Sequence, residues 1–218
     1  MERKTTPNKR KYLSLNEIKS LLQTIRRRPH GVRNYCLALI CFIHGLRASE
    51  LCRLRISDID LGARCIYIQR LKNGFSTIHP LLEEEIQALK AWLDVRTHFR
   101  HATEEWLFLS CKGNHLSRKQ FHQIISTSGT IAGISLNIHP HMLRHSCGFA
   151  LADQGIDTRL IQDYLGHRNI RHTVWYTASN PGRFCGIWER RGIRSSSDPD
   201  RTFISILKSI IYQSENDF

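Results

Sequence analysis

Apolar residues recur at helical spacing along most of this chain, so the pattern of hydrophobic and polar positions predicts its elements. Ser14 and Glu17 form a capping-box sequence, which predicts a helix from there to about Ile25. Residues 32–44 are apolar on nearly every face and predict a buried helix that ends at Gly45. The same spacing predicts four more helices, over residues 81–99, 117–126, 140–155 and 158–165.

A strand-like pattern occurs between residues 64 and 79. Residues 64–69 and 75–79 each read as a strand, and Asn73-Gly74 between them is the strongest short signal for a hairpin turn. Lys72 is therefore expected at the tip of a β-hairpin. Residues 106–109 predict a further short strand or extended segment. Together these patterns predict a mainly α-helical (α+β) domain with a small β-hairpin or sheet.

Capping residues refine the prediction for the C-terminal half. Pro140 suits a first helical turn, where no backbone donor is needed. Residues 127–138 are expected to form a loop before it. Asp157 should begin the next helix, Gly166 should end it, and Asn169 should cap the segment after it. The apolar stripe expected on the helix between Asp157 and Gly166 consists of Leu160, Ile161, Tyr164 and Leu165.

Charge points to a partner. The chain has 32 Lys and Arg against 19 Asp and Glu, a formal net charge of +13, which predicts a polyanion, most simply nucleic acid. An anionic membrane surface is the alternative. No apolar run reaches the roughly 18 to 20 residues of a membrane span, and the N-terminus has no apolar stretch of a secretion signal. We expect a soluble cytoplasmic protein associated with the nucleoid.

Cysteine and histidine usage predicts no metal site. The seven cysteines are scattered, form no C-x-x-C pair and read as reduced core residues. His139, His141 and His145 invite a zinc reading, but no Glu follows His141, and Arg144 would place a fixed cation among the ligands. We therefore expect no metal and no other cofactor.

Several polar residues have ordinary explanations when each is considered alone. His141 and Arg144 are three residues apart, which puts both on one helix face near the positive N-terminal end and suits a phosphate. Such a pair is more often part of a solvated face. Arg47 and Glu50 would by themselves be a helical ion pair, and Tyr176 beside a tryptophan would be core packing.

The order of these residues changes the interpretation. The chain contains Gly45-Leu46-Arg47-Ala48-Ser49-Glu50-Leu51, the hairpin Lys72, His141-Met142-Leu143-Arg144, Leu165-Gly166-His167 and then Tyr176. This order resembles the tyrosine recombinase (phage integrase) family, and it extends over roughly residues 10 to 188. The stretches 34–36, 41–45 and 166–179 look like the small fimbrial phase-variation invertases.

The resemblance implies specific roles. Arg47 and Arg144 would bind the scissile phosphate, with Glu50 in support. Tyr176 would attack the phosphorus and form a 3′-phosphotyrosine intermediate, and Lys72 would protonate the leaving oxygen. No metal is needed, because the two guanidiniums neutralise the charge of the transition state, and no ATP is needed, because the covalent intermediate conserves the bond energy.

His141 and His167 complete the implied set. Each would hydrogen-bond the phosphate or assist proton transfer, in a division of roles that the sequence leaves open. Because His167 directly follows a predicted helix end, a protonated imidazole is expected there.

The resemblance also implies an organisation. Residues 13–182 would form the catalytic domain, preceded by a basic arm over residues 1–12 and followed by a basic linker and apolar segment over residues 183–218. Arg47 comes too early for the family's usual N-terminal DNA-clamping domain, so the arms, partner protomers or host DNA-bending proteins would clamp the DNA.

The expected function is inversion of a promoter-bearing DNA segment that switches fimbrial gene expression. The partners would be double-stranded DNA with inverted repeats and, on synapsed DNA, a homotetramer. Two alternatives stay open: a non-catalytic, sequence-specific DNA-binding regulator with the recombinase fold, and relaxation of DNA in the manner of type IB topoisomerases.

Overall fold

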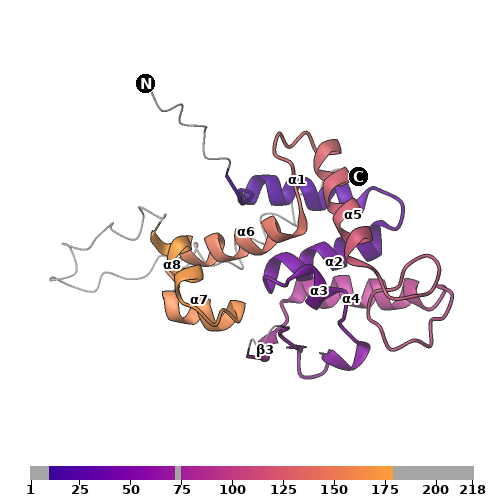
Figure 1. Ribbon diagram of the computed structural model, residues 1–218. Coiled ribbons are helices and arrows are strands. Elements are labelled where there is room, and N and C mark those ends of the chain that lie inside the picture. Colours follow the sequence, from indigo (N-terminus) through magenta and orange to yellow (C-terminus); the bar gives the residue numbers. More distant parts are fainter. Residues whose placement is uncertain (1–9, 72–74, 179–218) are drawn as a thin grey trace.

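The computed structural model describes residues 10–71 and 75–178. Within them the chain is mainly helical, with a small antiparallel sheet (Figure 1). The helices are α1 (Leu15–Arg26), α2 (Gly31–Ile43), α3 (Ala48–Leu51), α4 (Glu83–Arg96), α5 (Arg118–Ile131), α6 (Pro140–Asp153), α7 (Thr158–Leu165) and α8 (Arg171–Ala178). The strands are β1 (Ile59–Asp60), β2 (Cys65–Ile68) and β3 (Thr77–Pro80), preceded by a 3₁₀ turn, η1 (Ile56–Asp58).

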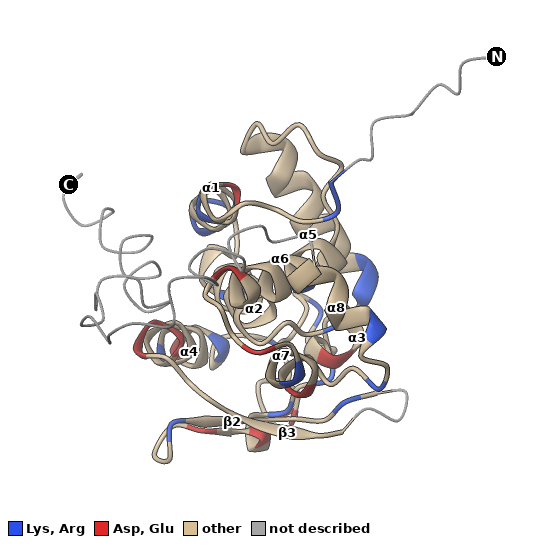
Figure 2. Cartoon of the chain, turned by 90° about the vertical axis from the view of Figure 1, so that its left-hand side faces the viewer, with Lys and Arg blue, Asp and Glu red and all other residues tan. Residues whose placement is uncertain are grey.

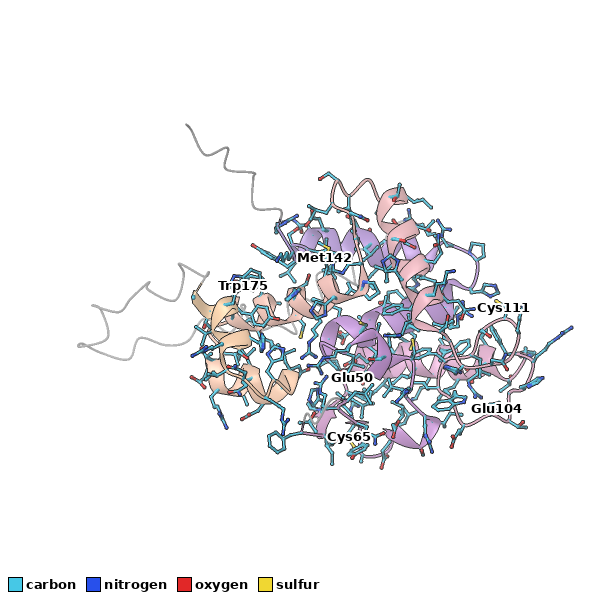
Figure 3. The ribbon with its side chains drawn as sticks, viewed as in Figure 1. Glu50, Cys65, Glu104, Cys111, Met142 and Trp175 are labelled. Atoms are coloured by element: carbon cyan, nitrogen blue, oxygen red, sulfur yellow. The ribbon has the colours of Figure 1, made fainter. Side chains whose placement is uncertain are left out.

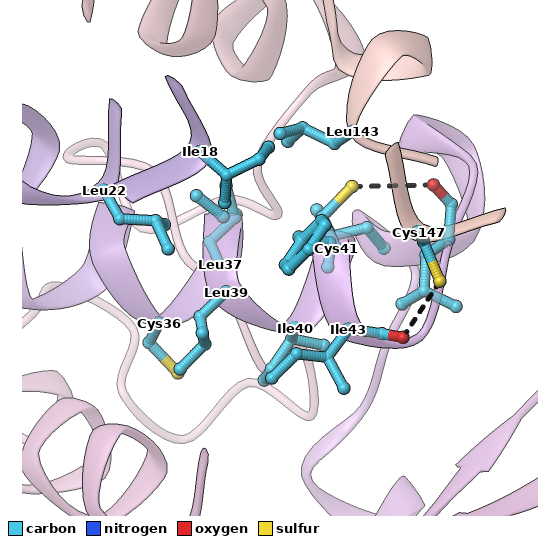
Figure 4. Packing of buried hydrophobic residues seen from close by; sticks show 14 of the residues in the cluster. Ile18, Leu22, Cys36, Leu37, Leu39, Ile40, Cys41, Ile43, Leu143 and Cys147 are labelled. Carbon is cyan, nitrogen blue, oxygen red and sulfur yellow. Dashed lines mark hydrogen bonds between the residues drawn. The ribbon is translucent and has the colours of Figure 1, made fainter. Parts of the chain in front are cut away.

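Helix α2 is the centre of the core. Its residues 36–42 are fully buried, and it packs against α1, α4 and α6. Figure 4 shows Cys41 on α2 and Cys147 on the adjacent α6, whose thiols donate to the carbonyls of Leu46 and Ile43, respectively. The predicted buried helix is confirmed, and an element apolar on nearly every face is buried along most of its length, although Val32 in its first turn is 40% exposed.

The predicted starts and ends of several helices are also confirmed. Ser14 Oγ accepts from the Glu17 amide and the Glu17 carboxylate accepts from the Ser14 amide, so the capping box begins α1. Asp157 caps α7, and Gly166 ends it in the left-handed conformation, with φ 65°. Asn169 Oδ1 accepts from the Arg171 amide at the start of α8.

The predicted hairpin is present as the pairing of β2 with β3, in which Ile66 lies opposite His79. Its turn, with Lys72, lies outside the described residues. Strand β1 was not predicted, because two residues are too short to show an alternating pattern. Figure 2 shows the sheet at the end of the molecule opposite α1, with Lys and Arg spread over helices and sheet alike.

Two predictions need correction. Helix α5 continues to Ile131, so the expected loop does not begin at residue 127. Gly129 therefore lies inside the helix, where a Cβ would approach Ile138 Cδ1 to 2.5 Å, so the absence of a side chain lets the following segment pack this closely. Leu160 is 58% exposed and is not part of the buried stripe of α7. Of the two forms predicted for residues 106–109, a short strand or an extended segment, the structure has no regular strand there, and Trp106 and Leu109 each make an isolated bridge.

Helices α7 and α8 pack against α6 and against each other, at the end of α6 away from α4 and α5 (Figure 1). Of the cysteines in the described part of the chain, four are buried and all six are free thiols. The described helices include none with the length and apolar character to cross a bilayer.

Candidate active site

The first motif is the turn from α2 into α3. Gly45, with φ 55°, makes this turn, and Arg47 is the N-cap of α3. Glu50 accepts from the Arg47 backbone amide at 3.0 Å and from the Arg47 guanidinium at 2.6 Å. The Glu50 side chain is 1% exposed and that of Arg47 is 28% exposed. The buried carboxylate of Glu50 therefore orients the guanidinium of Arg47, which still reaches the surface.

A second arginine holds Glu50 from the other side, and sequence reasoning missed it. The fully buried Arg70 guanidinium lies 3.0 Å from Glu50 Oε2 and also donates to the backbone carbonyls of His44 and Tyr164. Burial alone would raise the pKa of Glu50, but the Arg47 amide and the charges of Arg70 and Arg47 outweigh it and lower that pKa. Glu50 is therefore ionised at neutral pH.

Arg144, on α6, is 1% exposed and joins two other segments of the site. One guanidinium nitrogen donates to the Gly45 carbonyl and another to the Leu165 carbonyl. Burial, followed by the charges of Arg47 and Arg70, lowers its pKa to about 10. Arg144 is still a cation at neutral pH, and it fixes the end of α2 to the end of α7.

His141 lies on the first turn of α6, where burial and then the charge of Arg144 lower its pKa. His167 follows α7, and its Nδ1 lies 2.9 Å from Thr173 Oγ1. The expectation that His167 is protonated is wrong. Burial, followed by the charges of Arg144 and Arg47, lowers its pKa to about 3, because these effects outweigh the negative end of a short helix.

Tyr176, on α8, is 1% exposed, and its ring lies against α6. A Cβ at Gly148 would lie only 2.7 Å from Tyr176 Cε2, so the absence of a side chain makes room for the ring. The hydroxyl lies 3.0 Å from Nδ1 of His145, a residue that sequence reasoning considered only as a metal ligand. Burial raises the pKa of Tyr176 to about 12, although Arg144 and Arg47 oppose the shift.

The described motif residues thus come from four segments and converge. Glu50 on α3 and Trp175 beside Tyr176 on α8 mark two sides of the site in Figure 3. Charges of Arg47 and Arg144 act on His141, on His167 and on Tyr176 alike. The sixth catalytic candidate, Lys72, lies outside the described residues.

The sequence model of the phage integrase family matches residues 11–183. The chain belongs to this family. Type 1 fimbriae regulatory protein FimB of Escherichia coli (strain K12) is 71% identical over 190 residues, which cover 87% of this chain and 95% of FimB. Type 1 fimbriae regulatory protein FimE of the same strain is 50% identical over 187 residues, 85% of this chain and 94% of FimE.

A solved relative carries DNA. The crystal structure of the XerH site-specific recombinase bound to difH substrate, in a pre-cleavage complex, matches with a TM-score of 0.69 and 26% identity. The match covers 82% of this chain and 53% of that chain. The fold is therefore that of a tyrosine recombinase catalytic domain, as the order of motifs implied.

Proposed function

We propose that this protein is a site-specific DNA recombinase that inverts a promoter-bearing DNA segment and so switches fimbrial gene expression. The observation that carries the proposal is the convergence of Arg47, Arg144 and Tyr176 from segments far apart in the sequence: Arg144 donates to the carbonyl of Gly45, two residues before Arg47, and the residue after Arg144 contacts the Tyr176 hydroxyl. Similarity to FimB supports the fimbrial assignment, and similarity to DNA-bound XerH supports DNA as the substrate.

In the proposed reaction the Tyr176 oxygen attacks the scissile phosphorus, and an oxygen–phosphorus bond forms as the bond to the 5′-oxygen breaks. Arg47 and Arg144 neutralise the charge that develops on the phosphoryl oxygens. Because the guanidiniums are already held by Glu50 and by backbone carbonyls, little reorganisation accompanies the chemistry. Lys72, assigned by its motif alone, protonates the departing 5′-oxygen.

His141 and His167 are assigned to the phosphate in this proposal. The lowered pKa of each favours the neutral imidazole, which can still donate one hydrogen bond to a phosphoryl oxygen. For His167 the bond between Nδ1 and Thr173 Oγ1 fixes the ring and leaves Nε2 for the substrate.

The assembly belongs to the same proposal. Inversion requires two DNA sites to be held together, so a homotetramer on synapsed inverted repeats, helped by host DNA-bending proteins, is the expected working form. The domain of residues 13–182 would be supplemented by a basic arm and a C-terminal segment, whose residues 1–9 and 183–218 lie outside the described part of the chain. Arg10, at the end of that arm, pairs with Glu17 at 2.6 Å.

The decisive experiment compares wild type with Tyr176→Phe on a nicked suicide substrate. This substrate carries the inverted repeat that the protein protects from nuclease in a footprinting experiment on the genomic DNA around the protein's gene. Wild type should accumulate a protein–DNA adduct on a denaturing gel, with the DNA-linked peptide containing Tyr176. Tyr176→Phe keeps the ring and loses the nucleophile, so it should bind the duplex normally and form no adduct.

Tyr67→Phe is the matched control, because Tyr67 lies on β2 and is 43% exposed. It should form adduct at the wild-type rate. An adduct with Tyr176→Phe would show that another residue is the nucleophile. Binding without any wild-type adduct would replace the recombinase with the non-catalytic regulator, and relaxation of a supercoiled plasmid without inversion would favour topoisomerase-like activity.

A further inference from the structure

The nucleophile proposed above has a hydrogen-bond partner that its motif does not include. His145 follows Arg144 on α6, and its Nδ1 lies 3.0 Å from the Tyr176 hydroxyl oxygen. We propose that His145 is the general base that accepts the phenolic proton of Tyr176 during DNA cleavage. This inference rests on the proposed function and adds a catalytic residue to it.

The surroundings fix this contact. On α6, Gly148 lies under the Tyr176 ring and His145, one turn earlier, meets the hydroxyl. Phe149 and Trp175 stand edge-on to each other, and Trp175 also stands edge-on to the imidazole of His145 at 5.8 Å. Both partners of the hydrogen bond are therefore held by packing, and the distance is within the range for proton transfer.

The protonation states suit the transfer. Burial, followed by the charges of His141, Arg144, His139 and Lys11, lowers the pKa of His145 to about 4, so the imidazole is neutral at physiological pH. A neutral imidazole can accept through Nδ1. Since burial raises the pKa of Tyr176 to about 12, the phenol will not ionise by itself near pH 7 and needs a base.

Bound DNA would make His145 a stronger base. The cation nearest to His145 in the chain, Arg144, lowers the proton affinity of the imidazole. A phosphate bound to Arg144 brings a negative charge that offsets this effect. The imidazole would then bind a proton more readily when the substrate is in place than in the free protein.

The other two histidines of the site are less suited to this role. Nδ1 of His167 is engaged with Thr173 Oγ1, and its ring is roughly parallel to that of Tyr176, with the centroids 6.3 Å apart. His141 contacts the edge of His145 rather than the hydroxyl, with ring centroids 4.5 Å apart. Of these three histidines, His145 is the one that contacts the Tyr176 hydroxyl.

The O–H bond of Tyr176 breaks as its oxygen bonds to phosphorus, and the proton moves to His145 Nδ1, giving an imidazolium. The phosphorus–O5′ bond breaks, and the leaving oxygen takes its proton from the general acid. In rejoining, the 5′-hydroxyl attacks the phosphotyrosine and returns its proton to the group that acted as general acid, while the phosphorus–oxygen bond to Tyr176 breaks and the imidazolium gives its proton to the departing phenolate oxygen.

The test measures single-turnover adduct formation between pH 6 and 9 on the nicked suicide substrate, for wild type, His145→Phe and His145→Gln. Loss of a general base should slow His145→Phe by about 10²-fold or more at neutral pH. The wild-type rate should be flat across this range, because the base is neutral throughout. The rate of His145→Phe should rise about tenfold per pH unit, since hydroxide must then remove the proton.

His145→Gln keeps a polar side chain without a comparable base and should show the same rising profile, which covers the case in which phenylalanine disturbs the fold. His98→Phe, an exposed histidine beyond α4, is the matched control and should behave as wild type. Duplex binding and melting temperature confirm that each variant is folded.

Three outcomes would overturn the inference. Unchanged rates would remove His145 from the chemistry. Faster cleavage by His145→Phe would mean that the hydrogen bond only holds Tyr176 away from DNA. Slower cleavage with a flat pH profile in both variants would make His145 a positioning residue. None of these outcomes affects the Tyr176 adduct in wild type, whose absence would instead refute the proposed function.

Discussion

The two sides of the candidate site are held in different ways. One side is the guanidinium cluster, which we define as Arg47, Arg70 and Arg144 with the carboxylate of Glu50. Arg70, Arg144 and Glu50 have no more than 5% of their surface exposed, and they are bonded to one another or to backbone carbonyls. The other side is the nucleophile helix, α8, which packs against α6 and α7.

The nucleophile helix is far less buried. Only Thr173 and Tyr176 of its residues are buried, while Val174 and Trp175 are each 43% exposed. A short helix with little buried surface is among the parts of a protein that open most easily. The comparison teaches that the charges are fixed by buried hydrogen bonds, whereas the nucleophile, itself 1% exposed, lies on a helix that is held by much less buried surface.

Among variants that keep the nucleophile, the largest effect is expected for Arg144→Met, which removes a charge from the guanidinium cluster. Loss of one transition-state stabiliser lowers cleavage by about 10²- to 10³-fold. The carbonyls of Gly45 and Leu165 also lose their donors, which destabilises the fold by about 1 to 3 kcal/mol for each buried group left unpaired. Suicide-substrate cleavage and thermal melting measure the two effects separately.

Arg96→Met is the matched control for this variant. Arg96 is also a buried arginine, and its guanidinium donates to the carbonyls of Leu107, Ala102, Glu104 and Trp106, away from the site. It should lower the melting temperature and leave the cleavage rate of the folded protein unchanged. Equal cleavage losses in both variants would mean that Arg144 acts through stability alone.

A smaller effect is expected for Arg70→Met, because Arg70 acts through Glu50 on Arg47 rather than on the phosphate. Less accurate positioning of the Arg47 guanidinium should slow cleavage by about tenfold to 10²-fold, with duplex binding little changed. Arg70→Met and Glu50→Gln should be non-additive, the double variant cleaving about as fast as the slower single one. If the losses of the two single variants add up in the double variant, Arg70 does not act through Glu50 on Arg47.

The same division explains how much the sequence could predict. The helices around α2 and their caps were predictable, because apolar periodicity and capping residues are local signals, as Ser14 and Gly166 illustrate. The motif order identified the family and the residues that converge. Arg70 was not predictable, because its partners, Glu50 and Tyr164, lie 20 and 94 residues away in the chain.

The protonation state of His167 was mispredicted for a related reason. The motif order places it with Arg47 and Arg144, but the sequence does not show that burial and these two charges outweigh the helix end, which favours a cation. His145 could have been noticed, because it adjoins Arg144 and lies one helical turn from His141. Its contact with Tyr176 depends on the packing of α8 against α6, which no local pattern in the sequence specifies.

The smallest effect is expected for Gly148→Ala. This variant tests whether the nucleophile helix shifts when a side chain fills the space on α6 that the Tyr176 ring occupies. The new Cβ would lie 2.7 to 2.8 Å from three atoms of the Tyr176 ring, well inside van der Waals contact, so the ring and α8 must shift. We expect single-turnover cleavage to slow by about fivefold to tenfold, because the hydroxyl moves away from His145 while the guanidinium cluster stays in place. Duplex binding should be unchanged.

The matched control is Gly129→Ala on α5, another crowded helical glycine, whose Cβ would meet Ile138 rather than a site residue. It should lower the melting temperature without changing the cleavage rate of the folded protein. If Gly148→Ala cleaves as fast as wild type, the seat of Tyr176 on α6 is irrelevant to catalysis. If it instead weakens duplex binding as strongly as cleavage, the guanidinium cluster and the nucleophile helix are not independent, and the contrast between them fails.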